Sequence, residues 1–393
     1  MNRVPTNSAG AMPGGAASAG TEADTAVQGP GRVPDGRVER RRHARPSYRT
    51  ETLLRRELRV RYPAGRGRMV LRTELNWGED VEPLDISEDG ETSTFALEAM
   101  RPFLYVKVCL RSADGTHWSV GPNMLVLMTN QGPRDVFPYF QGPAAGSLSH
   151  VIELDSTILG RKHLLRIYFP PGYRENTLRR YPVLYMQDGK NLFFPEEAFG
   201  GREWQVDETL QLLDGMNAAD RVIVVGIYSG DRTGEYTKPG YEAYARSVAE
   251  EVKPEIQRRA RVLGSPQETG VIGSSLGGVV SFYMAWQHPE AFGYAGCMSS
   301  PFSLRDDLID RVLSEPVHAS KFYLDSGWPG DNYEVTAGMA MALNQRGYRP
   351  LEDFLHLVFP HDQHDEGAWG RRLHIPVQLG LGPIAAARRG RFI

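Results

Sequence analysis

A glycine-rich hexapeptide constrains this chain more than any other stretch. Residues 273–278 are Gly-Ser-Ser-Leu-Gly-Gly, with apolar Val271 and Ile272 before them and an apolar run over 279–286 after them. This pattern predicts a strand, a tight turn and a helix, the setting in which the middle serine of G-x-S-x-G acts as a nucleophile. The flanking glycines remove Cβ atoms that would collide with neighbouring backbone. Ser275 is therefore our candidate nucleophile, although a glycine-rich corner without chemistry would carry the same motif.

Length and composition bound the class of protein. The 393 residues predict two or three domains, and 41% hydrophobic with 24% charged residues is ordinary for a soluble globular protein. A formal net charge of −3 favours no nucleic-acid or membrane partner, and two distant cysteines exclude a disulfide framework. The N-terminus lacks the apolar core of a secretory signal. We expect a cytoplasmic protein that binds a small molecule, and a homo-oligomer stays open.

The first third of the chain divides into a tail and a β-rich region. Residues 1–45 are rich in Gly, Ala, Ser, Pro and Thr, which predicts a disordered tail, and the basic run at 37–45 is interpreted as a solvated linker. Strand-like segments at 68–75 and 103–110, with Asp-Gly turns at 89–90 and 114–115, predict a small β-sandwich over 46–130. Trp77 and Trp118 are interpreted as core residues, with sugar-stacking platforms as the alternative.

The rest of the chain alternates between strand and helix patterns. Residues 131–148 carry Gly-Pro pairs and predict a linker, and residues 149–393 predict a mostly parallel sheet with helices on both faces. Strands are expected at 163–169, 182–186, 222–227, 293–298, 321–324 and 353–359. Helices are expected at 204–213, 241–260 with a kink at Pro254, and 332–346.

A base and an acid follow the serine in the order that α/β hydrolases use. His364 is the candidate base, because a predicted helix starts directly after it, and His361 is held in reserve. Asp325 and Asp331 are the candidate acids; we prefer Asp331, since it follows a Gly-Trp-Pro-Gly turn that can carry it over the sheet edge. A metal site would use both histidines with three neighbouring acids, Asp362, Asp365 and Glu366, but the HExxH spacing is absent. No cofactor or metal is therefore expected.

The oxyanion hole needs two backbone N–H groups. One is expected from Leu276, next to the nucleophile, and the other from the loop after the strand at 182–186. In that loop Gly189 or Lys190 is the predicted donor, because a glycine permits close approach of backbone to ligand.

Three motifs together resemble one family. The segment 181–193 (YPVLYMQDGKNLF), the Ser275 hexapeptide and the segment 359–369 (FPHDQHDEGAW) are similar to the Putative esterase family of α/β hydrolases, which includes esterase D, feruloyl esterases, mycolyltransferases and enterochelin esterases. The resemblance covers about residues 148–380 and implies an α/β-hydrolase fold, with Ser275 as nucleophile, His364 as base and Asp331 as acid. The segment 105–123 resembles the immunoglobulin-like modules that precede enterochelin-esterase-like domains.

The resemblance also implies residues around the substrate. Arg232 and Glu235 match an Arg and a Glu-Tyr that the family often carries, either in contact with substrate or holding a loop. Asp188 stands where many relatives have histidine, which separates this chain from those branches. The leading hypothesis is a serine esterase that forms an acyl-enzyme, in the manner of enterochelin esterases. The alternatives are a feruloyl or carbohydrate esterase, an acyltransferase and a non-catalytic glycan-binding protein.

Overall fold

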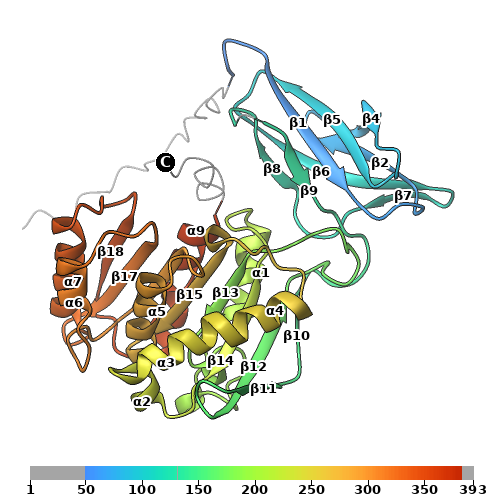
Figure 1. Cartoon of the computed structure of the whole chain (residues 1–393). Coiled ribbons are helices and arrows are strands. Elements are labelled where there is room, and N and C mark those ends of the chain that lie inside the picture. Colours follow the sequence, from blue (N-terminus) through green and yellow to red (C-terminus); the bar gives the residue numbers. More distant parts are fainter. Residues whose placement is uncertain (1–48, 131, 383–393) are drawn as a thin grey trace, which may run out of the picture. The chain divides into compact units, whose positions relative to one another are not determined.

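A computed structural model describes residues 49–130 and 132–382 of the chain (Figure 1). The predicted tail at 1–45, with its basic run, lies outside the described residues. Within the described ranges, no helix combines the length and the apolarity needed to cross a bilayer.

Two antiparallel-rich sheets form the first part of the described chain. One has the order β4-β5-β1-β9 and the other the order β3-β2-β6-β7, with β8 also paired to β6. The strands are β1 Leu54–Arg61, β2 Arg68–Thr73, β3 Asn76–Val81, β4 Asp85–Ile86, β5 Thr92–Ala99, β6 Phe103–Ser112, β7 Gly115–Trp118, β8 Met124–Leu127 and β9 Arg134–Val136.

Alternating residues of both sheets enter one buried cluster. Leu58 and Val60 of β1 and Val106 and Val108 of β6 belong to it, as period-two strands with one buried face require. The two predicted Asp-Gly turns join β4 to β5 and β6 to β7, both antiparallel pairs.

The interpretation of both tryptophans as core residues is wrong, because neither Trp77 nor Trp118 belongs to the buried cluster between the sheets. The side chain of Trp118 is 42% exposed, and its ring lies 6.3 Å from that of Trp77, centroid to centroid. Trp118 pairs with Cys109 of β6, whereas Val108 and Leu110 on either side of Cys109 enter the cluster between the sheets. Because neighbouring residues of a strand point to opposite faces, Trp118 lies on the outer face.

The segment predicted as a linker, 131–148, contains two short strands. Strand β9 pairs with β1, and β10 (Ser147–Leu148) pairs with β12. Its ends therefore take part in the sheets that precede and follow it.

A mixed sheet organises the second part of the described chain and confirms the predicted α/β class. Its order is β10-β12-β14-β13-β15-β16-β17-β18, with β11 also paired to β12, and the ladders from β14 to β18 are all parallel. Its remaining strands are β11 Ile152–Ser156, β12 Arg161–Phe169, β13 Val183–Met186, β14 Ile223–Tyr228, β15 Thr269–Ser274, β16 Tyr294–Met298, β17 Lys321–Trp328 and β18 Phe354–Pro360.

Helices cover both faces of this sheet. Val183 and Tyr185 of β13 pack in one buried cluster with α3 to α7, and Leu184 and Met186 pack in another with α1, α8 and α9. The α-helices are α1 Val206–Gly215, α2 Arg232–Tyr236, α3 Gly240–Ser247, α4 Lys253–Arg259, α5 Leu276–Gln287, α6 Leu308–Ser314, α7 Tyr333–Gln345, α8 Glu366–Arg372 and α9 His374–Leu381. The short segments are η1 Gly189–Asn191, η2 Phe199–Gly201, η4 Pro266–Glu268 and the π-helix η3 Val248–Val252.

A π-helical segment, η3, directly precedes the turn that contains Pro254, the residue at which a kink is predicted. Helix α3 continues through η3 into α4, and Figure 1 shows them as one continuous ribbon. Proline has no N–H to donate, so the regular α-helical ladder is interrupted just before it.

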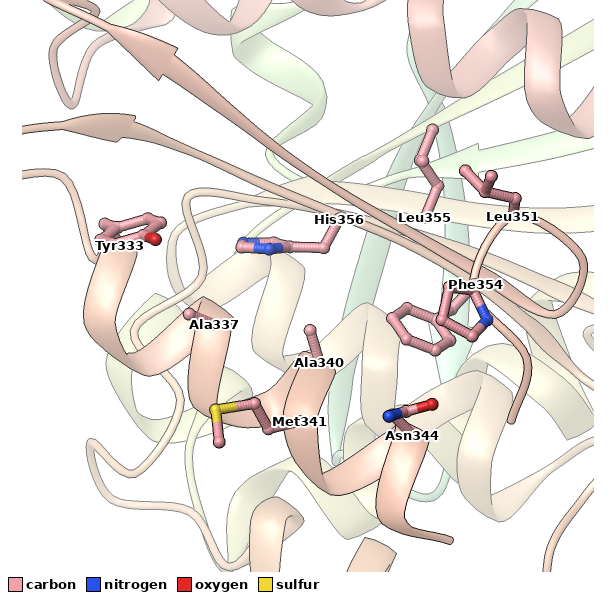
Figure 2. Close-up of a pocket in the computed structure, with 10 residues that line it drawn as sticks. Tyr333, Ala337, Ala340, Met341, Asn344, Leu351, Phe354, Leu355 and His356 are labelled. Atoms are coloured by element: carbon pink, nitrogen blue, oxygen red, sulfur yellow. The ribbon is translucent and has the colours of Figure 1, made fainter. Parts of the chain in front are cut away.

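A shallow groove of about 340 Å³ lies between α7 and the edge strand β18. Figure 2 shows Tyr333, Ala337 and Met341 on the helix and His356 on the strand. None of the candidate catalytic residues lines this groove.

Candidate active site

The turn between β15 and α5 has the geometry that the sequence motif predicts. Ser275 has φ 53° and ψ −129°, a backbone conformation that residues other than glycine rarely adopt. A Cβ on Gly273 would lie 2.3 Å from the carbonyl oxygen of Gly277, so only glycine fits there. The turn thus presents Ser275 at the carboxyl edge of the parallel sheet, where ligands of such sheets bind.

His364 lies between Ser275 and Asp331. Its Nε2 is 2.9 Å from Ser275 Oγ, and its Nδ1 is 2.6 Å from Asp331 Oδ1. It precedes α8, whose N-cap Asp365 accepts a hydrogen bond from the Ala368 N–H, so the helix start predicted after His364 is present. His361, the reserve candidate, has no such contacts to Ser275 or Asp331 among the hydrogen bonds of the described residues.

The two candidate acids differ in their surroundings. Asp331 is buried, and its Oδ2 accepts hydrogen bonds of 2.6 Å from Ser299 Oγ and from the Gly327 N–H. Burial would raise the pKa of Asp331, but hydrogen bonds from His364, Ser299 and Gly327 outweigh it and hold the pKa below its usual value. Asp331 is therefore an ionised carboxylate in contact with the imidazole.

Asp325 lies inside β17, which continues to Trp328, and it does not end the strand as predicted. The strand is longer because Ser326 and Gly327 keep pairing with β18. Asp325 accepts from Tyr323 Oη at 2.7 Å and lies 3.2 Å from Arg372 Nη2. Burial raises its pKa to about 6 although Arg372 opposes this. Asp325 thus contacts Arg372 and Tyr323, and no hydrogen bond of the described residues joins it to His364.

The backbone donors predicted for an oxyanion hole come from adjacent strands. Leu276 starts α5 after β15, and Gly189 and Lys190 start η1 after β13, which pairs with β15. A Cβ on Gly189 would lie 2.5 Å from Cδ1 of Tyr228 and 2.8 Å from the Gly226 carbonyl carbon. The glycine is required for packing on β14.

Of the three predicted substrate-binding residues, two form an ion pair beside the turn that carries Ser275. Arg232 donates to both carboxylate oxygens of Asp188, at 2.9 and 3.0 Å, and its Nη2 lies 3.4 Å from the Ser274 carbonyl oxygen. Glu235 instead pairs with Arg161 of β12 and accepts from the Gly230 N–H, so it holds its loop. Asp188 and Arg232 thus lie beside Ser274, whereas the contacts of Glu235 are with Arg161 and its own loop.

Sequence reasoning missed Ser299 and Arg372, both buried behind Asp331. Ser299 directly follows β16, and residues at the carboxyl ends of parallel strands converge on one edge, so a signal for Ser299 was present. Arg372 is the last residue of α8 and does not follow a strand, so its position in the sequence gives no comparable signal.

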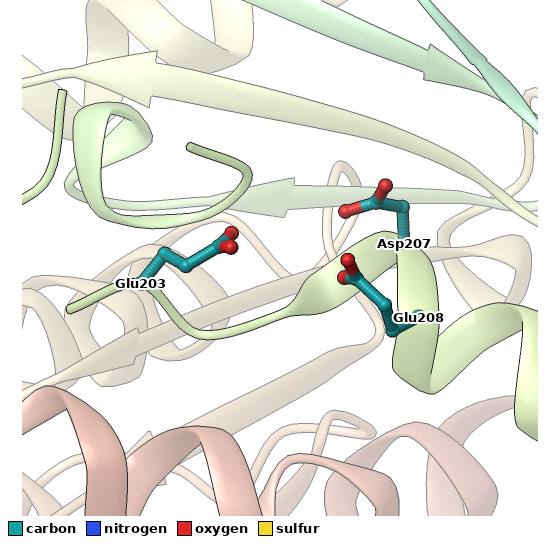
Figure 3. Close-up of side chains that lie close together, drawn as sticks. All are labelled: Glu203, Asp207 and Glu208. Carbon is teal, nitrogen blue, oxygen red and sulfur yellow. The ribbon is translucent and has the colours of Figure 1, made fainter. Parts of the chain in front are cut away.

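Carboxylates gather at a different position, before and within the first turn of α1. Glu203, Asp207 and Glu208 are the one group of three or more metal-ligand side chains within 4.8 Å of one another in the described ranges (Figure 3). Burial, with the nearby charges of Glu208 and Asp207, raises the pKa of Glu203 to about 7. His361 and His364, considered above as metal ligands, do not belong to the group.

Known proteins resemble this chain in sequence and in fold. Uncharacterized protein YbbA of Bacillus subtilis (strain 168) is 27% identical over 154 residues, 35% of this chain and 56% of YbbA. Endo-1,4-beta-xylanase/feruloyl esterase of Xylanibacter ruminicola is 24% identical over 189 residues, 45% of this chain and 25% of the relative. The chain thus spans about half of one relative's length and a quarter of the other's.

A solved ferulic acid esterase has a similar fold, with a TM-score of 0.51 and 19% identity, over 60% of this chain and 98% of that one. Residues 156–370 match the family described as Putative esterase, and this range contains Ser275, Asp331 and His364. On this match over more than half of its length, the chain belongs to the Putative esterase family.

Proposed function

We propose that this protein is a serine esterase that cleaves a carboxylic ester through an acyl-enzyme, with Ser275 as nucleophile, His364 as base and Asp331 as acid. The observation that carries the proposal is the unbroken contact from Ser275 Oγ through His364 to Asp331, with steps of 2.9 and 2.6 Å. A serine hydroxyl is a weak nucleophile unless a base takes its proton, and the base needs a partner that orients it.

In the first half of the reaction, Nε2 of His364 takes the hydroxyl proton as Ser275 Oγ attacks the ester carbonyl carbon. The negative charge that develops on the carbonyl oxygen is stabilised by the N–H groups of Leu276 and of Gly189 or Lys190. The intermediate then expels the alcohol, which receives the proton from His364. The acyl group stays on Ser275 as an ester.

In the second half, water attacks the acyl-enzyme while His364 takes one of its protons. The acid product leaves, and the proton returns to Ser275 Oγ. Asp331 stays ionised throughout, because its hydrogen bonds hold its pKa low, and it stabilises the imidazolium that forms twice in each cycle. This mechanism uses no metal or organic cofactor.

For the substrate we retain an enterochelin-type siderophore ester as the first candidate and a feruloyl or carbohydrate ester as the second. The first rests on the domain order: we propose an immunoglobulin-like sandwich, predicted over 46–130 and extended by β9, followed by a hydrolase domain, predicted from 149 and extended by β10, with the rest of 131–148 as the linker. The second is supported by the name of the Xylanibacter relative. Asp188 and Arg232 would contact polar groups of either substrate. An acyltransferase would use the same residues, with an alcohol in place of water.

The test is covalent labelling with a fluorophosphonate probe, together with hydrolysis of p-nitrophenyl acetate, in the wild type and in Ser275→Ala. Both signals should disappear in the variant. Ser281→Ala is the matched control, because Ser281 is a buried serine on α5 whose hydroxyl donates to the Gly277 carbonyl. Labelling that survives Ser275→Ala would sink the assignment, and a wild type with neither signal would favour a non-catalytic binding protein.

A further inference from the structure

Ser299 lies behind the acid Asp331 and is in contact with three side chains at once. Its hydroxyl oxygen is 2.6 Å from Asp331 Oδ2, 3.0 Å from Trp369 Nε1 and 2.9 Å from Arg372 Nη2. Ser299 itself is fully buried, and Arg372 is 3% exposed, so water does not compete for these contacts.

The direction of each hydrogen bond follows from the chemistry of the partners. The indole N–H and the guanidinium N–H can only donate, so both lone pairs of the Ser299 oxygen accept. A hydroxyl has one proton, and among the described residues the partner that remains for it is the Asp331 carboxylate. Trp369 and Arg372 therefore lock the Ser299 O–H onto Asp331 Oδ2, which leaves Oδ1 for His364.

The backbone of Ser299 is held as firmly as its side chain. Its N–H donates to the Asp325 carbonyl at 2.8 Å, and its carbonyl accepts from Asn332 Nδ2 at 2.8 Å. Its φ of 47° lies in the left-handed region, which costs energy for a serine and persists only where the surroundings impose it. The hydroxyl is thus fixed in position before any substrate arrives.

We propose that Ser299 is a positioning residue for the triad acid: it stabilises the negative charge of Asp331 and fixes the orientation of its carboxylate. This inference rests on the proposed function. The Ser299 hydroxyl is the third donor to the Asp331 carboxylate, besides His364 and the Gly327 N–H, and it stabilises part of the negative charge. Without the Ser299 hydrogen bond, the carboxylate would attract the imidazolium form of His364 more strongly. The carboxylate could also rotate, so that Oδ1 no longer lies in line with the N–H at Nδ1 of His364. The first effect delays release of the proton, and the second misaligns the base.

Other charges also act on this site and must stay constant in a test. They are Asp325 on β17, Asp362 in the loop after β18, Glu366 and Arg372 on α8, Asp188 in the loop after β13, and Arg232 on α2. A substitution at Ser299 keeps the number and type of these charges, but it removes a partner of Arg372, whose Nη2 donates to the Ser299 hydroxyl and lies 3.8 Å from Asp331 Oδ2. A difference between the wild type and a Ser299 variant therefore reports the hydroxyl together with this response of Arg372.

Two variants separate the hydroxyl from the backbone. Ser299→Ala and Ser299→Gly both remove the hydroxyl, but only glycine relaxes the positive φ, so the two should differ in thermal stability. Both should lower kcat by about tenfold with KM within about twofold, and both should move the acid limb of the pH–rate profile upward by about half a unit. Ser320→Ala is the matched control, a buried serine whose hydroxyl donates to the carbonyls of Ala285 and Phe292.

A second measurement does not depend on hydrolysis. The NMR titration of the His364 imidazole, assigned with His364→Ala, should move to higher pH in both Ser299 variants and stay unchanged in Ser320→Ala. Unchanged titration and acid limb in either Ser299 variant would overturn the inference, and so would an equal change in Ser320→Ala. If the wild type neither hydrolyses esters nor reacts with the phosphonate, the proposed function fails while the titration still tests the role of Ser299.

Discussion

Ser275 Oγ and His364 Nε2 lie 2.9 Å apart although 89 positions separate the two residues in the chain. The contact exists because β15 and β18 end at the same edge of the parallel sheet, with β16 and β17 between them. The turn after β15 lifts the serine into a strained backbone conformation, and the loop after β18 brings the imidazole over it. The proposed nucleophile is therefore also a residue with a strained backbone conformation.

Replacing Ser275 by glycine should inactivate the enzyme and stabilise the fold. Glycine accepts φ 53° without the steric cost that serine bears, and this gain exceeds the added entropy of the unfolded chain. We expect the free energy of unfolding to rise by about 1 kcal/mol. Chemical denaturation of the wild type, Ser275→Gly and Ser275→Ala measures it. Alanine keeps the strain and should leave stability near that of the wild type, so equal values for both variants would contradict the prediction.

Asp331→Asn should lower kcat by about 10³-fold or more, because an amide holds the imidazole in the wrong tautomer and does not stabilise the imidazolium. Asp325→Asn should keep kcat within about tenfold of the wild type, since Asp325 contacts Arg372 and Tyr323 and not His364. Because burial raises the pKa of Asp325 to about 6, its charge lowers stability above that pH, so Asp325→Asn should be less destabilising at pH 8 than at pH 5. Turnover and denaturation are measured on both variants, and a larger kcat loss in Asp325→Asn would reverse the assignment of the acid.

Glu203→Gln should stabilise the protein above neutral pH. In the folded chain the pKa of Glu203 is about 7, against 4.5 without the effects of burial and neighbouring charges. Between these values the folded state binds more protons than the unfolded state, so this group lowers stability as pH rises through the window. With allowance for solvent screening, we expect a gain of about 1–2 kcal/mol at pH 8 and little change at pH 4. Thermal unfolding at the two pH values measures it, and an equal gain at both would exclude the titration of Glu203 as the cause.

Gly189→Ala should destabilise the fold by about 2 kcal/mol, because its Cβ would overlap Tyr228 and the backbone of β14. The same displacement would move the N–H groups of Gly189 and Lys190, so kcat should also fall. Gly215→Ala, at the end of α1, is the matched control: a Cβ there meets no atom within 4 Å. Denaturation and turnover of both variants check the prediction, which fails if Gly189→Ala is as stable as the control.

Local patterns in the chain were sufficient for the α/β class, for the longer strands and helices after residue 163 and for much of the candidate site. The strand, turn and helix around Ser275 follow from glycine placement and apolar runs, and the helix start after His364 follows from its capping aspartate. Trp118 shows the limit of such patterns, because strand register, which composition does not encode, decided which face it occupies.

The sequence alone carried Ser275, His364 and two candidate acids between them, Asp325 and Asp331, because motifs of neighbouring residues specify local backbone geometry. The tertiary structure decided which carboxylate meets the histidine, since Asp331 and Asp325 differ in the contacts of their side chains and not in residue type. It also brought Ser299 and Arg372, 73 positions apart, into one buried contact. Packing of the strand ends and α8 makes that contact, and spacing along the chain does not specify such packing.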